Sequence, residues 1–211
     1  MHTQRLITYA SAISLVTLMA WSTLAIAEDE RGNPNALLKG TYRYTMTASC
    51  SSSAAFTALP DLQPVGGGGA STTHTNGVLT YDGLGNGTVN QRGIVINPGP
   101  YSFGEPVTVR PIVWERQQCN WRYRVNGDRT FTQGDGDCVG VDKYGPEEFG
   151  IPGEQVTITN MRWEGQIGAG GQTLIFNQQV EPAIETLTTN TGFTTQRVCG
   201  YTGTAVRIRP E

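Results

Sequence analysis

The chain has 211 residues and a formal net charge of −3 at pH 7, from 18 acidic and 15 basic side chains. This balance excludes the strongly basic proteins that bind nucleic acids or anionic membranes mainly through charge. The sequence has two histidines and no C-x-x-C pair, so it lacks the usual ligand pattern of a zinc site. We therefore expect no nucleic-acid partner, no metal and no cofactor.

The first 27 residues have the pattern of a signal peptide. Arg5 gives a charged start, an apolar stretch follows over residues 6–20, and Ala25-Ile26-Ala27 supplies the small residues that signal peptidase recognises. Serines and threonines interrupt the stretch, which disfavours a membrane anchor, because a spanning helix needs about 20 mainly apolar residues. Cleavage after Ala27 would leave 184 residues with a formal charge of −4. We expect an exported protein, periplasmic or extracellular, with no membrane span in its mature chain.

The mature chain begins with a polar segment, residues 28–36, which we interpret as a flexible lead-in. Residues 37–211 have the length of a single domain. Over residues 38–47 large aromatic or apolar side chains alternate with polar ones: Tyr42, Tyr44 and Met46 point one way, and Arg43 and the threonines point the other way. A period of two predicts a half-buried first strand.

Strand and turn signals alternate along the rest of the chain. Residues 51–73 are rich in serine, glycine and threonine and predict a long loop, and residues 134–154 predict another. Because no segment has a sustained helical period, we predict an all-β domain of eight or nine strands. The favoured fold is an antiparallel up-and-down barrel, and the alternative is a β-sandwich. Further segments of strand character lie at 77–81, 87–96, 107–114, 120–125, 129–132, 156–165, 172–180, 184–188 and 194–208.

The four cysteines all lie in the mature region, and an even number in an exported chain indicates two disulfides. Asn-Gly at 126–127 predicts a tight type I′ hairpin, which brings Cys119 to within four residues of facing Cys138. Cys50 ends the first strand and Cys199 begins the last, and these strands are neighbours in a closed barrel. We therefore predict the pairs Cys119–Cys138 and Cys50–Cys199.

The two ends of the domain resemble the lipocalin (calycin) family. Gly40-Thr41-Tyr42 is similar to the Gly-x-Trp that opens the family's first strand, with tyrosine in place of tryptophan. Arg207 or Arg209 ends the last strand, where the family places an arginine over the aromatic ring. The resemblance implies that Gly40, Tyr42 and Arg207 close the barrel by a cation–π contact and that the barrel forms a cup for a small apolar ligand. The chain is also similar to uncharacterised bacterial exported proteins with an Arg-x-Cys segment, here residues 197–199.

Large aromatic side chains are the candidates for lining such a cup. Trp121 and Tyr123 share one face of a predicted strand, and Trp114 and Trp163 lie in two others. One face of each strand in a small barrel points inward, so these side chains could instead fill the core. We name Trp114, Trp121, Tyr123 and Trp163 as candidate ligand contacts.

Signatures of catalysis are weak. The sequence has no G-x-S-x-G segment, and His74, the single histidine after residue 27, lies beside the predicted loop, where we expect it to be exposed. We therefore predict no catalytic residue and favour a small-ligand-binding barrel, with a structural or adhesive cell-envelope protein as the alternative. A carboxylate-based hydrolase is third, because paired acids could serve such chemistry. The available acids are Asp135, Asp137, Glu147, Glu148, Glu164, Glu181 and Glu185.

Overall fold

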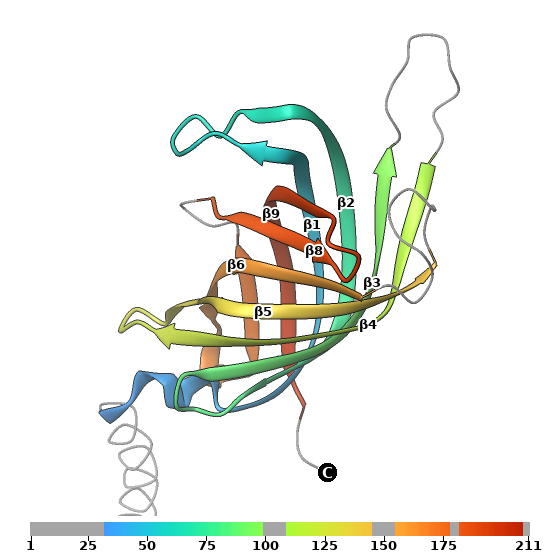
Figure 1. Ribbon diagram of the computed structural model, residues 1–211. Coiled ribbons are helices and arrows are strands. Elements are labelled where there is room, and N and C mark those ends of the chain that lie inside the picture. Colours follow the sequence, from blue (N-terminus) through green and yellow to red (C-terminus); the bar gives the residue numbers. More distant parts are fainter. Residues whose placement is uncertain (1–31, 99–108, 145–154, 178–181, 209–211) are drawn as a thin grey trace, which may run out of the picture.

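A computed structural model describes residues 32–98, 109–144, 155–177 and 182–208 (Figure 1). Within these residues nine strands form one antiparallel sheet, in the order β1-β2-β3-β4-β5-β6-β7-β9-β8. The additional pairing of β1 with β9 closes the sheet into a barrel. The antiparallel all-β barrel predicted from the sequence is therefore confirmed, and the sandwich is not formed.

The position between β6 and β9 is shared by two short strands. β7 pairs with one end of β6, at residues 164–167, and β8 pairs with the other end, at residues 156–159. Both also pair with β9, so the barrel has eight positions around its circumference. The strands are β1 (Gly40–Phe56), β2 (Pro64–Tyr81), β3 (Asn86–Pro98), β4 (Val109–Val125), β5 (Thr130–Tyr144), β6 (Gln155–Ile167), β7 (Thr173–Asn177), β8 (Ile184–Thr189) and β9 (Thr194–Arg207).

The 3-10 helix η1 (Pro34–Leu38) packs on one end of the barrel, which we call the closed end. Its Leu38 is fully buried, and the backbone N–H of Val125 donates to Oδ1 of Asn35 at 2.9 Å. A second 3-10 helix, η3 (Ala169–Gly171), lies in the connection between β6 and β7. Residues 34–36, expected to be part of a flexible lead-in, thus belong to the barrel's end.

β1 and β2 continue through most of the segment predicted to be a loop, and the connection between them is only residues 57–63. Serines of β1 pair with the glycine run of β2, as in Ser53↔Gly68 and Ser52↔Gly69. Ladder pairing outweighs the low strand propensity of these residues, because β9 also supports β1 as far as Ser53. The β1–β2 hairpin bends over the end of the barrel opposite η1, the distal end (Figure 1).

The turn between β4 and β5 differs from the predicted type I′ turn. Neither Asn126 nor Gly127 has a positive φ, and the left-handed residue is Arg129, with φ of 67°. The backbone N–H of Asn126 donates to the carbonyl of Thr130 at 2.8 Å. This longer turn pairs Val125 with residue 131 instead of residue 128 and so moves the register by three residues.

The new register lengthens both strands of this hairpin. β5 runs through residues 134–144, which the sequence predicted as part of a loop, and β4 joins two predicted strands into one. Irregular pairing around Gly136 absorbs the extra residues and places Cys138 directly opposite Cys119.

In the part of the chain that the structure describes, no helix has the length and apolar character needed to cross a membrane.

Candidate functional site

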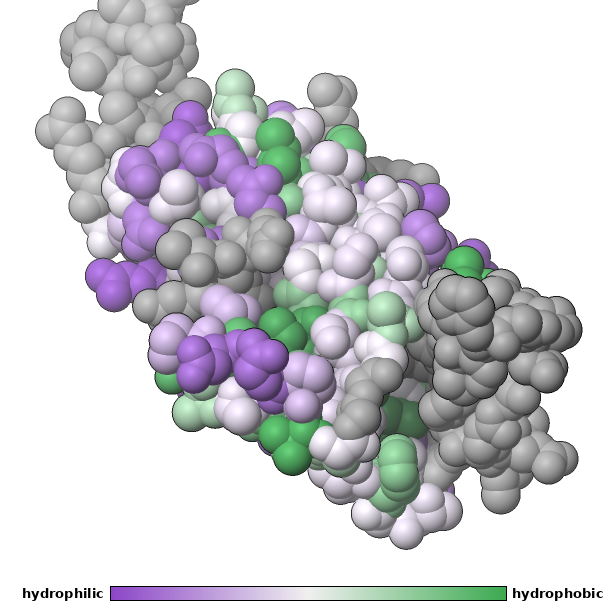
Figure 2. All heavy atoms as spheres, turned by 90° about the horizontal axis from the view of Figure 1, so that it is seen from above, coloured by the Kyte–Doolittle hydropathy of each residue, from purple (hydrophilic) through white to green (hydrophobic). Residues whose placement is uncertain are grey.

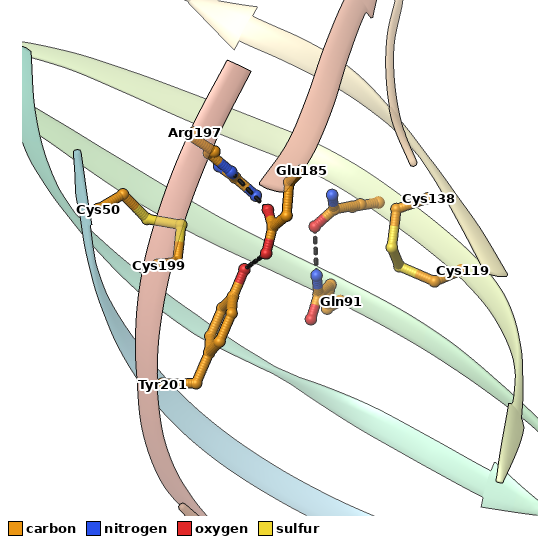
Figure 3. A network of polar contacts seen from close by, with 9 residues as sticks. Cys50, Gln91, Cys119, Cys138, Glu185, Arg197, Cys199 and Tyr201 are labelled. Atoms are coloured by element: carbon orange, nitrogen blue, oxygen red, sulfur yellow. Dashed lines mark hydrogen bonds and ion pairs between the residues drawn. A yellow bond between two sulfur atoms is a disulfide. The ribbon is translucent and has the colours of Figure 1, made fainter. Parts of the chain in front are cut away.

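Two disulfides lie inside the barrel (Figure 3). Cys50–Cys199 joins opposed residues of β1 and β9 and therefore lies across the seam that closes the barrel, and Cys119–Cys138 joins opposed residues of β4 and β5. The pairing is the one expected from the sequence. All four cysteines are buried, and two disulfides fit an oxidising compartment.

The interior next to the closed end is filled by aromatic rings. Neighbouring rings meet edge to face with centroids 5.0–6.5 Å apart, the arrangement that aromatic quadrupoles favour. Phe131 and Phe176 have almost no exposed surface. The rings therefore fill this half of the barrel interior and form a packed core. We call the set the aromatic cluster: Tyr42, Tyr44, Tyr81, Tyr123, Phe131 and Phe176.

Arg207 covers the aromatic cluster at the closed end. Its Cζ lies 5.3 Å from the centroid of the Tyr42 ring, and its Nη2 donates to the carbonyl of Lys39 at 2.6 Å. Gly40 has φ of 139°, and a Cβ there would lie 3.2 Å from Nε of Arg207, so glycine allows the close approach. This is the closure that the lipocalin resemblance implies for Gly40, Tyr42 and Arg207, whereas Arg209 lies outside the described residues.

Three of the four predicted ligand contacts are buried in the core of the barrel. Trp121 and Trp163 are buried with ring centroids 5.1 Å apart, and Tyr123 belongs to the aromatic cluster. The cavity beside the two tryptophans measures about 10 Å³, so these rings fill the interior and leave no open cup between them. The side chain of Trp114 lies outside the described residues, although its backbone belongs to β4.

Toward the distal end the interior becomes polar and contains a buried ion pair (Figure 3). Nε of Arg197 donates to Oε2 of Glu185 at 2.7 Å, and the hydroxyl of Tyr201 donates to Oε1 of the same carboxylate. Burial opposes the charge of Arg197, but the Glu185 carboxylate outweighs it and raises the pKa of the guanidinium. Burial, assisted by the same carboxylate, raises the pKa of Tyr201 well above its ordinary value. The guanidinium of Arg197 is therefore charged beside a neutral tyrosine.

Two glutamines face this ion pair from β3 and β4. Gln91 and Gln117 are opposed across the two strands, and Nε2 of Gln91 donates to Oε1 of Gln117. The other amide atoms, Oε1 of Gln91 and Nε2 of Gln117, are buried without a protein partner, as is the hydroxyl of Thr73. We call Thr73, Gln91, Gln117, Glu185, Arg197 and Tyr201 the polar layer.

The polar layer surrounds a cavity of about 20 Å³, which we call the chamber. Five of its six members line the chamber, and Glu185 is joined to two of them. Met46 and Met161 are among the residues that complete the wall. The chamber therefore lies among side chains that can donate and accept hydrogen bonds, next to a charge pair that is already internally balanced.

Sequence reasoning named Glu185 only among the available acids and Arg197 only within an Arg-x-Cys segment, and it did not consider the glutamines. A usable signal existed, because Arg197, Cys199 and Tyr201 are spaced two apart and so share the inner face of β9. The same spacing places Gln91 on the inner face of β3 with Val89.

The other candidates for chemistry do not converge. Within the described ranges no group of three histidine, cysteine or acidic side chains could hold a metal ion. Glu147, Glu148 and Glu181 lie outside the described residues. His74 is exposed on the outer face, with Nδ1 3.2 Å from the hydroxyl of Thr47. It borders an open hollow of about 490 Å³ over β1, β2, β7 and β9, and half of the residues that line this hollow are threonines.

Figure 2 looks onto the distal end of the barrel. The hydrophobic residues visible there form small separate areas, mostly among residues of intermediate hydropathy, and the hydrophilic residues gather toward one side of the view. Scattered exposed apolar side chains are normal for a folded protein. The interior is therefore the better candidate site.

No protein-family model matches the chain, and no curated protein or solved structure matches it. The fold and the interior alone define the class of protein. It is a closed antiparallel barrel with two interior disulfides, a core of rings at one end and a buried polar layer toward the other.

Proposed function

We propose that this protein is an exported small-ligand-binding barrel, lipocalin-like in plan, that holds a polar group of its ligand at the polar layer. The observation that carries the proposal is the set of buried hydrogen-bonding atoms without a protein partner around the chamber: Oε1 of Gln91, Nε2 of Gln117 and the hydroxyl of Thr73. Leaving one such atom unpaired costs about 1–3 kcal/mol. A bound polar group would remove this cost for all three.

The connections at the two ends support entry from the distal end. At the closed end the strands are joined by residues 82–85, 126–129 and 168–172. At the distal end the described connections are 57–63 and 190–193, and the first of them is longer than any at the closed end. Binding residues are often carried by loops that a rigid scaffold positions. The chamber is small, so a ligand would insert a small group or displace the side chains of Gln91 and Gln117.

Export is part of the proposal. Residues 1–27 resemble a signal peptide, and the two disulfides are compatible with the periplasm or the extracellular space. Native mass spectrometry on protein exported by a bacterial host and purified without denaturant tests it, together with a thermal-shift screen of small polar solutes. We expect a bound molecule, or a stabilising solute, that is lost in the double variant Gln91→Leu/Gln117→Leu and retained in the outer-face control Thr88→Val. If no solute stabilises the native protein more than the double variant, the proposal is wrong.

A structural or adhesive role in the cell envelope is the second candidate. It is favoured by the filled interior, because the cavities at the polar layer and beside the tryptophans measure only about 20 and 10 Å³. A disulfide across the seam would suit a rigid scaffold. Defined oligomers without a bound molecule in the same mass spectra would favour this function.

A further inference from the structure

We infer that the chamber binds a neutral group that both donates and accepts hydrogen bonds, and that one ordered water molecule takes this place in the free protein. The inference deepens the proposed function, since it states the chemistry of the group that the polar layer would recognise. It rests on the charge, the hydrogen-bonding inventory and the size of the chamber.

The charge balance of the polar layer requires a neutral occupant. The carboxylate of Glu185 is neutralised by Arg197 and accepts a further hydrogen bond from Tyr201. A second anion in the chamber would compete with Glu185 for the guanidinium of Arg197, which lines the chamber, and a cation would lie beside that guanidinium. Either would leave a net charge in the interior, which is costly away from water.

The unpartnered atoms require an occupant that can both donate and accept hydrogen bonds. Nε2 of Gln117 can only donate, Oε1 of Gln91 can only accept, and the hydroxyl of Thr73 can do both. A halide ion would leave Oε1 of Gln91 without a donor, and an aliphatic group would satisfy none of the three atoms. Water, an alcohol or a primary amide satisfies donors and acceptors together.

The size of the chamber selects the smallest of these groups in the free protein. A cavity needs roughly 10–15 Å³ to hold one water molecule, and a buried water usually makes about three hydrogen bonds. The chamber measures about 20 Å³ and offers three buried atoms without partners, in addition to the guanidinium of Arg197. One water therefore fits both the space and the number of available partners.

Crystals of the mature protein grown in bromide provide the direct test. We expect one ordered water within hydrogen-bond distance of Nε2 of Gln117 and Oε1 of Gln91, and no anomalous bromide signal in the chamber. Soaking with acetamide should replace that water by the amide, whereas soaking with acetate at the same concentration should not. An empty chamber, or a bromide or acetate ion inside it, would overturn the inference.

A stability measurement tests the water independently of crystals. If a water molecule is hydrogen-bonded to the buried hydroxyl, Thr73→Val loses that hydrogen bond. The variant should then have a melting temperature lower by roughly 2–4 °C, because a loss of about 1 kcal/mol in the free energy of unfolding has this effect in a domain of this size. If nothing bonds the hydroxyl, the same change removes an unpaired buried group and raises the melting temperature, which contradicts the inference. The control Thr88→Val, on the exposed outer face, should leave it unchanged.

The inference and the proposed function can fail separately. A water seen in the chamber of a protein that no solute stabilises would leave the inference standing and refute the binding function. A charged ligand that binds in the chamber would support the binding function and refute the inference.

Discussion

The two ends of the barrel interior are stabilised by different physics. At the closed end the aromatic cluster buries large rings, and its hydroxyls mostly have partners, such as the carbonyl of Gly171 for Tyr42 and that of Asn35 for Tyr123. Toward the distal end the polar layer buries two charges and two amides. Burial of apolar area stabilises the first region directly, whereas the second is stable only while its partners remain matched. The closed end therefore maintains the fold through burial, and the polar layer would supply the recognition that the proposed function requires.

The largest expected effect comes from breaking the ion pair in the polar layer. Arg197→Met leaves Glu185 buried without its partner, and we expect a loss of about 3–5 kcal/mol in the free energy of unfolding, measured by urea denaturation. The double variant Glu185→Leu/Arg197→Met removes both charges and should recover most of this loss, because an apolar pair of similar volume is often as stable as a buried ion pair.

The aromatic cluster provides the contrasting case. Phe131→Ala should also cost about 3–5 kcal/mol, because it creates a cavity in a fully buried site. Truncating its neighbour Phe176 as well should add to the loss instead of restoring stability. If the double variant of the ion pair were no more stable than Arg197→Met, the distinction between the two regions would be wrong.

The next effect concerns the seam. Replacing Cys50 and Cys199 together by Ala should lower the free energy of unfolding by roughly 2–5 kcal/mol, the usual cost of removing a native disulfide. The residues are 149 apart in sequence, against 19 for Cys119 and Cys138. Since a longer closed loop restricts the unfolded chain more, the Cys50–Cys199 variant should be the less stable of the two. Equal stability in urea, or a free thiol at Cys50 or Cys199 in the oxidised protein, would contradict this.

Features set by local patterns could be predicted from the sequence, and features set by register between distant strands could not. The alternation around Tyr42 and Tyr44 predicted the inner face of β1, and the place of Cys50 and Cys199 at the ends of the first and last strands predicted their pairing. The polar layer depends on Gln91 facing Gln117, which follows from the ladder between β3 and β4.

The errors in the strand and turn predictions also arise from pairing between strands that a local pattern does not reveal. The glycine run of β2 has no local tendency to form a strand, and only its pairing with β1 makes it one. The turn between β4 and β5 was predicted from Asn126 and Gly127, whereas the positive φ is at Arg129, so the register predicted from turn chemistry was three residues wrong.

The tyrosines should make the barrel sensitive to alkaline pH. Burial raises the pKa of Tyr44, Tyr81 and Tyr201, and it raises the pKa of Tyr123 to about 12. In the unfolded chain these groups lose their protons near pH 10. Their contribution to stability is therefore complete below about pH 10 and is lost as the pH rises toward about 12 and beyond.

Absorbance of tyrosinate against pH, recorded together with circular dichroism, measures this effect. We expect the buried tyrosines to ionise together with unfolding at alkaline pH, after the exposed ones. Tyr81→Phe keeps the ring in the aromatic cluster and loses the bond to Gln133, so it should reduce the amplitude of the late phase. Ionisation of all tyrosines near pH 10 with the fold intact would contradict the burial of this cluster.

The smallest effect belongs to the turn that closes β2 and β3 below the aromatic cluster. Desolvation would raise the pKa of Asp82, but hydrogen bonds from Asn86, Leu84 and Gly85 outweigh it and lower the pKa to about 2. A depressed pKa in the folded state means that the stabilisation is present above about pH 4 and is lost as the pH falls toward about 2.

Asp82→Asn keeps an oxygen that can accept the backbone N–H groups of Leu84 and Gly85 but removes the charge. We therefore expect it to flatten the dependence of the urea midpoint on pH between about pH 4 and pH 2. Asp61→Asn makes the same change of charge in the connection at the distal end and serves as the control. A larger flattening in the Asp61 variant would mean that the acid sensitivity of the barrel arises at the distal end. In that case the closed end would be stable at low pH without this turn, through the burial of its rings alone.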